Sequence, residues 1–294
     1  MPGNSRGTGK HMTSHFKISG SSRVSLVRLS LLAAALFGVA GGAGGCSLTG
    51  NSAWNGVHAS AGLGLQEVNL TGSIDTDTEV SPGVFVTTEF DLEDNGGQDS
   101  SQQALYASAQ VGLAPIEFRV SAFEYSNDAS GIFTGDFLGT PFTGPVDTKF
   151  DIQAYKGTIG IDLLNLERLR IGALIGATVL DLDLRVSSSL VPGTEETLDE
   201  LVPAPVIGGR ADFKITGWLR VGGELTLLPI DEIEDFEVSF LDYEVGIHIE
   251  PFPYLEIFGL YRSLELEVEG DIDGSNASVD MGMSGPVFGV AITF

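Results

Sequence analysis

The chain has 294 residues, 43% of them hydrophobic, and carries 40 Asp and Glu against 15 Lys and Arg, for a formal net charge of −25 at pH 7. Such an acidic field repels nucleic acid and attracts cations, so nucleic-acid binding is excluded. The length and the 39 Gly fit one barrel-sized domain behind a processed N-terminus, and the single cysteine excludes an intrachain disulfide.

Residues 1–45 have the pattern of a cleaved export signal. Arg23 and Arg28 precede the apolar run 29–40, which is followed by the small residues 41–45. The run is too short and too rich in small residues to span a membrane as a helix. The polar residues before Arg23 make an unusually long n-region for this signal.

Cys46 follows at the expected cleavage point, and residues 46–56 are predicted to form a short linker. The position of this cysteine resembles that of the lipidated cysteine in bacterial lipoprotein signals, although Ala43 stands where Leu is usual. Two interpretations stay open: a lipid anchor at Cys46, or a free thiol beside an ordinary signal-peptidase cut.

After Cys46 the hydropathy alternates with a period of two. No apolar stretch of eighteen or more residues occurs there, so no transmembrane helix is predicted. In the run 104–113 the aliphatic side chains fall on one face and the polar ones on the other, and the run 116–122 repeats this pattern. Apolar-out and polar-in over about ten residues is what a strand of a transmembrane barrel requires.

The same analysis predicts ten strands joined by connections of alternating length. The strands are 57–70, 102–113, 116–126, 148–163, 168–184, 205–216, 218–228, 236–250, 254–269 and 278–294. Tight connections are at 114–115, 165–167, 216–217 and 251–253, long polar loops are at 71–101, 127–147 and 185–204, and shorter ones are near 229–235 and 270–277. This asymmetry is typical of periplasmic turns and extracellular loops. The predicted fold is an all-β, closed, antiparallel, up-and-down transmembrane β-barrel over residues 57–294, with about ten strands and with eight or twelve as alternatives.

Three segments depart from the simple pattern. Val84–Phe90 is predicted to extend the first hairpin above the membrane. Pro286 lies inside the last strand, where it has no N–H for the ladder, so a bulge or a late start is expected there. Around Leu174 both faces of the strand are apolar, which leaves its orientation open.

The polar face carries most of the cations that follow Cys46, together with acidic partners. The predicted lumen charge network is Arg119, Lys156, Arg170, Arg210, Lys214, Arg220 and Arg262 with Glu117, Asp162, Asp212, Glu224, Asp242, Glu244 and Glu256. An Arg or Lys facing the bilayer midplane costs about 2–4 kcal/mol, so this segregation itself favours the barrel. A ten-stranded interior is narrow, and two interpretations follow: side chains fill it, or they leave a thin, cation-biased pore.

Few residues in this sequence could take part in catalysis. After Cys46 only His58 and His248 provide imidazoles, and Ser60 shares the predicted lumen face with His58. A Ser–His pair needs contact within about 3 Å and a third group that orients the ring, which spacing alone does not give. No enzyme activity and no cofactor are predicted, with a lipid hydrolase using His58 and Ser60 as the alternative.

Acidic loop segments are candidates for weak cation binding. Asp75–Asp77, Asp91–Asp94 and Asp271–Asp273 offer oxygen ligands that suit Ca²⁺ or Mg²⁺, but none has EF-hand spacing. Solvated loops are the favoured interpretation, and divalent cations are retained as candidate partners.

The run Phe288–Phe294 alternates apolar with small or polar residues and finishes on an aromatic side chain. With the alternation of turns and loops, this ending resembles that of small bacterial outer-membrane β-barrels, over about residues 54–294. The resemblance implies a place in the outer membrane, contact with its lipid, and insertion by the barrel-assembly machinery. A structural or narrow-pore role is expected. The alternatives are a soluble or lipid-tethered, lipocalin-like barrel with an apolar interior, and a lipid-modifying enzyme.

Overall fold

The computed structural model describes residues 57–81, 84–98, 101–138, 140–191, 193–229, 232–233, 236–272 and 275–294. The predicted export signal, the linker and Cys46 lie outside these residues. Within the described ranges, the chain has no helix whose length and apolar character would let it cross a membrane.

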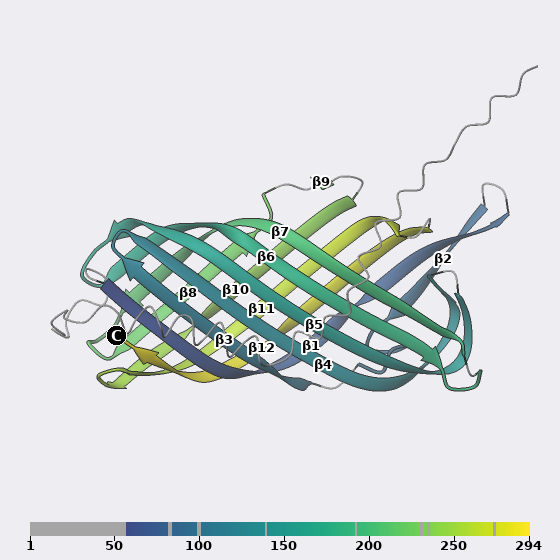
Figure 1. Ribbon diagram of the computed structural model, residues 1–294, viewed down its shortest axis with the longest axis horizontal. Coiled ribbons are helices and arrows are strands. Elements are labelled where there is room, and N and C mark those ends of the chain that lie inside the picture. Colours follow the sequence, from purple (N-terminus) through teal and green to yellow (C-terminus); the bar gives the residue numbers. More distant parts are fainter. Residues whose placement is uncertain are drawn as a thin grey trace, which may run out of the picture. The chain divides into compact units, whose positions relative to one another are not determined.

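The chain forms one antiparallel sheet that returns to its first strand through ten strands (Figure 1). The strands are β1 (Val57–Ser81), β2 (Val84–Asp91), β3 (Gln102–Leu113), β4 (Ile116–Phe137), β5 (Thr140–Asn165), β6 (Leu169–Ser188), β7 (Glu195–Lys214), β8 (Leu219–Leu227), β9 (Glu232–Ile233), β10 (Phe236–Phe252), β11 (Leu255–Ile272) and β12 (Ser275–Thr293). The ring runs β1-β3-β4-β5-β6-β7-β8-β10-β11-β12, and β12 pairs with β1. The predicted all-β fold with ten antiparallel strands is confirmed.

The two strands outside the ring are short additions to it. β2 pairs with the far end of β1, from Ser73 opposite Asp91 to Ser81 opposite Val84, which confirms the predicted extension of the first hairpin. β9 pairs only with the start of β10. Figure 1 shows β2 at the end of the barrel opposite to the C-terminus.

The C-terminus is tied to the first strand at the short-turn end. The backbone N–H of Phe294 donates to the carbonyl oxygen of Ala59 at 2.7 Å, and the N–H of Ala59 donates back at 3.1 Å. In a bilayer every backbone polar group needs a partner inside the protein, so closing the ring is a requirement for a sheet that spans it.

The predicted long loops at 127–147 and 185–204 were wrong, because strands occupy most of both segments. β4 and β5 pair from Ile116 opposite Ile161 to Phe137 opposite Thr140, and β6 and β7 continue in the same way up to Ser187 opposite Glu195. The segment 71–101 likewise contains the end of β1 and all of β2. These segments look like loops in sequence because Asp, Ser, Thr and Gly alternate with their apolar residues.

The strands are too long for a membrane alone. β5 has 26 residues, which at about 3.3 Å per residue and a tilt of about 45° gives a height of roughly 60 Å, against an apolar band about 25 Å tall. About half of the barrel therefore lies outside the bilayer.

The polarity of the wall inverts halfway along each long strand. On β5 the outward side chains near the short turns are Ile159, Ile161 and Leu163, which are 41%, 47% and 71% exposed. Farther along the same face the outward residues are Asp147 and Asp151. We call the part with the apolar exterior the membrane half, and the part beyond it, toward β2, the distal half.

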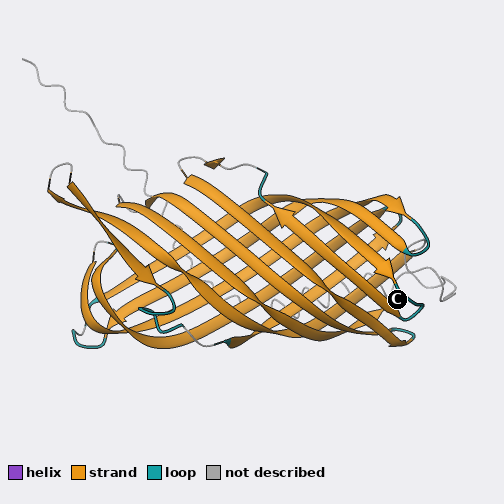
Figure 2. Ribbon diagram, turned by 180° about the vertical axis from the view of Figure 1, so that it is seen from behind, coloured by secondary structure: helices purple, strands orange, loops and turns teal. Residues whose placement is uncertain are grey.

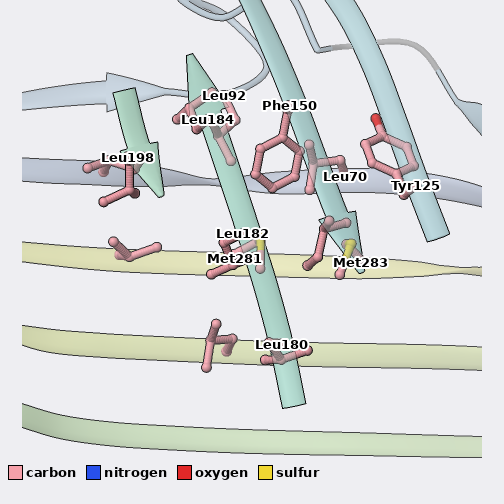
Figure 3. Packing of buried hydrophobic residues seen from close by; sticks show 14 of the residues in the cluster. Leu70, Leu92, Tyr125, Phe150, Leu180, Leu182, Leu184, Leu198, Met281 and Met283 are labelled. Carbon is pink, nitrogen blue, oxygen red and sulfur yellow. The ribbon is translucent and has the colours of Figure 1, made fainter. Parts of the chain in front are cut away.

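The interior inverts in the opposite sense. Inward positions of the membrane half hold the charged residues beside a small apolar cluster that includes Phe258 and Val287, whereas inward apolar residues of the distal half form one large cluster (Figure 3). Phe150, Leu180, Leu184 and Met281 of this cluster are each at most 4% exposed. The distal half thus has the apolar inside and polar outside of a water-soluble barrel, while the membrane half has the reverse.

Two irregular positions are now explained. Leu174 faces inward at 5% exposure, and Ile175 faces outward at 59%, which settles the orientation of β6. β12 runs through Pro286, so the predicted bulge or late start was wrong. Its ladder with β1 breaks only between Gln66–Val287 and Asn69–Ser284 and then resumes in the same register.

The apolar exterior of the membrane half, which we call the apolar belt, leads to a stability prediction. Ile175→Lys places a cation near the centre of the apolar exterior and should reduce folding into lipid vesicles by about 2–4 kcal/mol. Thr143→Lys, on the exposed exterior of the distal half, should have little effect. Urea titration of both variants in vesicles measures the difference, and equal losses would place the membrane elsewhere.

Candidate functional site

The candidate site is the interior of the membrane half, where all fourteen residues of the predicted lumen network lie on inward positions. Period-two alternation puts them there, because each strand points every second side chain into the barrel. Ion pairs within 4 Å link Arg119, Lys156, Arg170, Arg210, Arg220 and Arg262 to the seven carboxylates. Lys214 lies on the same face of β7, opposite Arg220 of β8 in the register, and also has a partner.

Glu117 is the centre of the group closest to the short turns. Its carboxylate, 1% exposed, accepts from Arg170 Nη2 at 2.6 Å and from Arg210 Nη1, and it lies 2.8 Å from His58 Nε2. Asp162 joins the same two guanidinium groups, with Oδ1 2.8 Å from Arg170 Nε and 2.8 Å from Arg210 Nη2. This cluster ties together five strands, β1, β4, β5, β6 and β7.

Asp242 is the centre of a second group, deeper in the barrel. Its side chain is fully buried, lying 2.9 Å from Lys156 Nζ and 3.1 Å from Arg262 Nε. Lys156 also lies 2.9 Å from Glu224, which in turn accepts from Arg119 at 2.8 Å. These pairs cross the lumen from β5 to β10.

A third group faces the short-turn opening. Arg220 donates to Asp212 at 2.8 Å and to Glu256 at 2.9 Å. His248 Nδ1 lies 2.8 Å from the other oxygen of Glu256. Both predicted lumen histidines are therefore bound to carboxylates of the network.

The network balances its own charge, with seven cations and seven carboxylates. Buried charges are tolerated only when they are paired and hydrogen-bonded, so this balance is what an enclosed lumen demands. Removing one partner leaves its counter-charge without compensation in a medium that cannot solvate it.

An aromatic layer closes the network on the distal side. Arg262 lies over the rings of Tyr106 and Phe123, 5.9 and 5.3 Å from their centroids. Tyr106 OH donates to Glu244 at 3.2 Å. Sequence reasoning missed this layer because aromatic residues at alternating positions give no indication of which charge they meet across the lumen.

A small polar cavity remains below this layer. It has a volume of about 40 Å³ and is lined by Ser60, Arg119, Glu244, His248 and Phe258, among others. A cavity of this size has room for water. Ser60 thus lines a cavity in the network, while the nearby His58 is bound to Glu117.

The exterior of the distal half is strongly acidic. Among the described residues of this wall, only Lys149 and Arg185 are outward-facing cations, and they lie directly opposite each other on β5 and β6. One row along the sheet, Asp151, Asp183 and Asp199 lie side by side on β5, β6 and β7. Within the described ranges, no three His, Cys, Asp or Glu side chains are arranged to hold a metal ion.

Two of these exterior carboxyls differ in their surroundings. Partial burial, followed by repulsion from Asp199 and Asp151, raises the pKa of Asp183. Hydrogen bonds from the hydroxyls of Ser130 and Ser189, both at 2.8 Å, lower the pKa of Asp147.

No protein-family model and no curated protein matches this sequence. The structure is similar to the outer-membrane protease OmpT from Escherichia coli, with a TM-score of 0.52 and 11% identity over 85% of this chain and 99% of that one. The Pseudomonas putida toluene transporter TodX (TM-score 0.31, 13% identity, 83% and 94% covered) and the Yersinia pestis protein Ail (0.32, 12%, 81% and 99%) match at scores that support no inference.

At this identity the OmpT match shows the fold alone. The fold is that of bacterial outer-membrane β-barrels, which confirms the resemblance found in the sequence. Together with the apolar belt and the closed ring, it places the chain in the bacterial outer membrane.

The network leads to a second stability prediction. Asp242→Asn leaves Lys156 and Arg262 without their shared counter-charge, and breaking a buried pair in this way should cost about 3–5 kcal/mol. The matched change Glu195→Gln removes the partner of Arg185, a pair whose side chains are 49% and 50% exposed, and should cost under about 1 kcal/mol. Urea midpoints in vesicles give both values, and similar losses would show that the lumen pairs are solvated.

Replacing the exterior carboxyls of Asp183 and Asp147 should change the stability of the barrel in opposite directions at pH 7. Because its pKa is raised in the fold, protonated Asp183 favours folding below the unfolded pKa of about 3.9, and this contribution is lost as pH rises through the folded pKa. Asp183→Asn should therefore stabilise the barrel at pH 7 and make little difference in acid.

Asp147→Asn is the matched comparison for Asp183→Asn, because the pKa of Asp147 is lowered in the fold. A lowered pKa contributes stability above the unfolded value, which is lost as pH falls through the folded one. This variant should be destabilised at pH 7, with the loss disappearing in acid. Urea midpoints across the pH range test both variants, and a shift of the same sign in the two would contradict the prediction.

Proposed function

We propose that this protein is a sealed, non-conducting barrel whose membrane half is an anchor and whose distal half holds an acidic surface in the external medium. The observation that supports it best is the inversion of wall polarity along single strands such as β5. The short turns correspond to the periplasmic rim, so the distal half projects outward from the cell.

A structural role is favoured over a pore because two different fillings block the interior in series. The membrane half holds a charge-balanced network, which supplies no net field that would select cations. Beyond it, Leu180, Leu184 and Met281 lie in a packed apolar layer that is at most 2% exposed. An ion crossing this layer would lose its hydration without gaining any polar partner.

The acidic exterior supports a role at the cell surface. Seven of the ten Lys and Arg after Cys46 are in the network, which leaves the distal wall with Lys149 and Arg185 against many carboxylates. Such a surface concentrates cations from the medium. Divalent cations that bridge these carboxylates to anionic outer-leaflet lipid are therefore proposed partners.

Binding of an apolar ligand is the second candidate function. The distal half meets the condition for a soluble binder, with Phe133, Phe137 and Phe142 inside and acids outside. The lipocalin-like alternative thus applies to one half of the barrel rather than to the whole chain.

We propose no catalytic activity. The match in E. coli is a protease, but its activity does not transfer at 11% identity. The hydrolase using His58 and Ser60 stays the alternative: Glu117, 2.8 Å from His58 Nε2, could orient the ring, but this carboxylate is shared with Arg170 and Arg210. Export by residues 1–45, an anchor at Cys46 and insertion by the barrel-assembly machinery remain predictions.

Conductance tests the sealed barrel. Purified protein inserted into a planar bilayer should carry no current, and Arg119→Ala should remain silent because the apolar layer lies beyond the cavity that this change enlarges. A pore would instead carry a cation-selective current that increases in Arg119→Ala. Lys149→Ala on the exterior is the matched control, and a mobility change on boiling confirms that each inserted sample is folded.

A further inference from the structure

A short turn after β2 folds into the barrel instead of crossing its rim. We call Leu92–Gln98 the mouth turn (Figure 2, teal segments beyond the β2 arrow). β1 pairs with β3 only up to Val68, and with β2 from Ser73 onward. The chain that links β2 to β3 is therefore free to turn inward at this level.

The mouth turn holds its own shape through local bonds. The backbone N–H of Asn95 donates to Asp91 O at 3.0 Å, and that of Gln98 donates to Leu92 O at 2.9 Å. Leu92 N–H donates to Gly72 O at 2.9 Å, which fixes the start of the turn to β1. The turn is thus a preformed unit with its own hydrogen bonds.

Two of its side chains are buried in the interior. Leu92 is 2% exposed and belongs to the apolar cluster of the distal half (Figure 3). Gln98 is 1% exposed, and its amide nitrogen donates to Thr148 Oγ1 at 3.2 Å. Asn127 Nδ2 donates to Gln98 Oε1 at 2.6 Å, and Thr148 Oγ1 donates to Gly96 O at 2.6 Å.

The inner face of β4 is shaped as a seat for this turn. Its inward residues there are Ala129 and Gly131, and a Cβ on Gly131 would overlap the carbonyl oxygen of Asn95. Among the described residues, no backbone–backbone hydrogen bond joins the mouth turn to β4 or β5. Side-chain hydrogen bonds, including Asn95 Nδ2 to Ile132 O at 3.3 Å, and the burial of Leu92 hold it in the seat.

We propose that the mouth turn is a displaceable stopper that occupies a small-molecule site on the inner wall of β4 and β5. The wall strands pair with each other from Ile116 opposite Ile161 to Phe137 opposite Thr140, so they do not depend on the turn. Moving the turn out frees the Asn127 amide and the Thr148 hydroxyl, next to the aromatic cluster of Phe90, Phe133 and Phe137.

The contacts of the turn define the ligand. It presents to the wall one aliphatic side chain, Leu92, two carbonyl-type acceptors, Gly96 O and Gln98 Oε1, and the amide N–H donors of Gln98 and Asn95. The turn itself carries the exposed side chains of Glu93 and Asp94, which repel anions. The site therefore suits a neutral or cationic molecule with an apolar body and a carbonyl or amide group.

This inference deepens the second candidate function and depends on the distal half facing the medium. While the mouth turn occupies the site, no ligand can bind there. The apparent Kd is therefore the intrinsic Kd divided by the fraction of molecules in which the turn has moved out. Displacing the stopper by mutation should therefore raise the apparent affinity.

The test uses the full-length barrel in lipid nanodiscs and prodan, a neutral naphthalene ketone whose emission shifts in apolar surroundings. Because prodan also enters lipid, the signal of protein-free nanodiscs is subtracted. Gly131→Ala expels the turn by steric overlap, and Gly157→Ala is the matched control, because a Cβ there meets no atom within 4 Å. The variant should bind prodan about tenfold or more tightly than wild type. Hydrogen exchange of residues 92–98 should accelerate in Gly131→Ala, and in wild type on adding prodan.

Gln98→Ala combined with Leu92→Ala provides a second route, since it weakens the stopper without changing the wall. The anionic dye 1-anilinonaphthalene-8-sulfonate should bind all forms poorly. Unchanged prodan affinity in both folded variants, or turn amides that stay protected in both, would overturn the proposal. Current through the wild-type barrel would overturn the sealed-barrel proposal instead and leave this one intact.

Discussion

The structure depends on one constraint: a β-strand offers each of its two faces every second side chain, so the media on both sides of the wall decide what each position holds. In the membrane half the outside is hydrocarbon, and the polar side chains must face inward and neutralise one another. In the distal half the outside is water, and the apolar side chains move to the interior. The same strand satisfies both demands because the composition of each face changes near Tyr155 and Lys156 of β5.

The two interiors differ in how they stabilise the barrel. The network in the membrane half links strands through directional, charge-assisted bonds whose partners are far apart in sequence, such as Arg119 and Glu224. The distal cluster is held by apolar burial, which is not directional and tolerates replacement by other apolar groups of similar volume. The mouth turn lies where the distal apolar cluster meets the medium. At this position a ligand could take the place of the turn with the least disturbance of the packing.

Much of the fold could be predicted from the sequence, because strand number and inward residues follow from period-two alternation. The fourteen network residues lie on the inward face for this reason. The distal strands were missed because Phe133, Phe137 and Phe142 alternate with Ser, Asp, Thr and Gly, a composition that is equally typical of loops. The mouth turn was missed because nothing in its sequence distinguishes a turn that folds inward from one that faces solvent.

The sequence by itself determined an acidic, antiparallel barrel of about ten strands, with eight or twelve as alternatives, since alternation and turn spacing are local properties of the chain. Only the tertiary structure decided which face of the distal strands is interior, which carboxylate each guanidinium meets, and where Leu92 and Gln98 are buried. Alternation separates two faces without saying which medium each one meets. Contacts across the lumen join residues as far apart as Arg119 and Glu244, whose proximity exists only after the ring has closed.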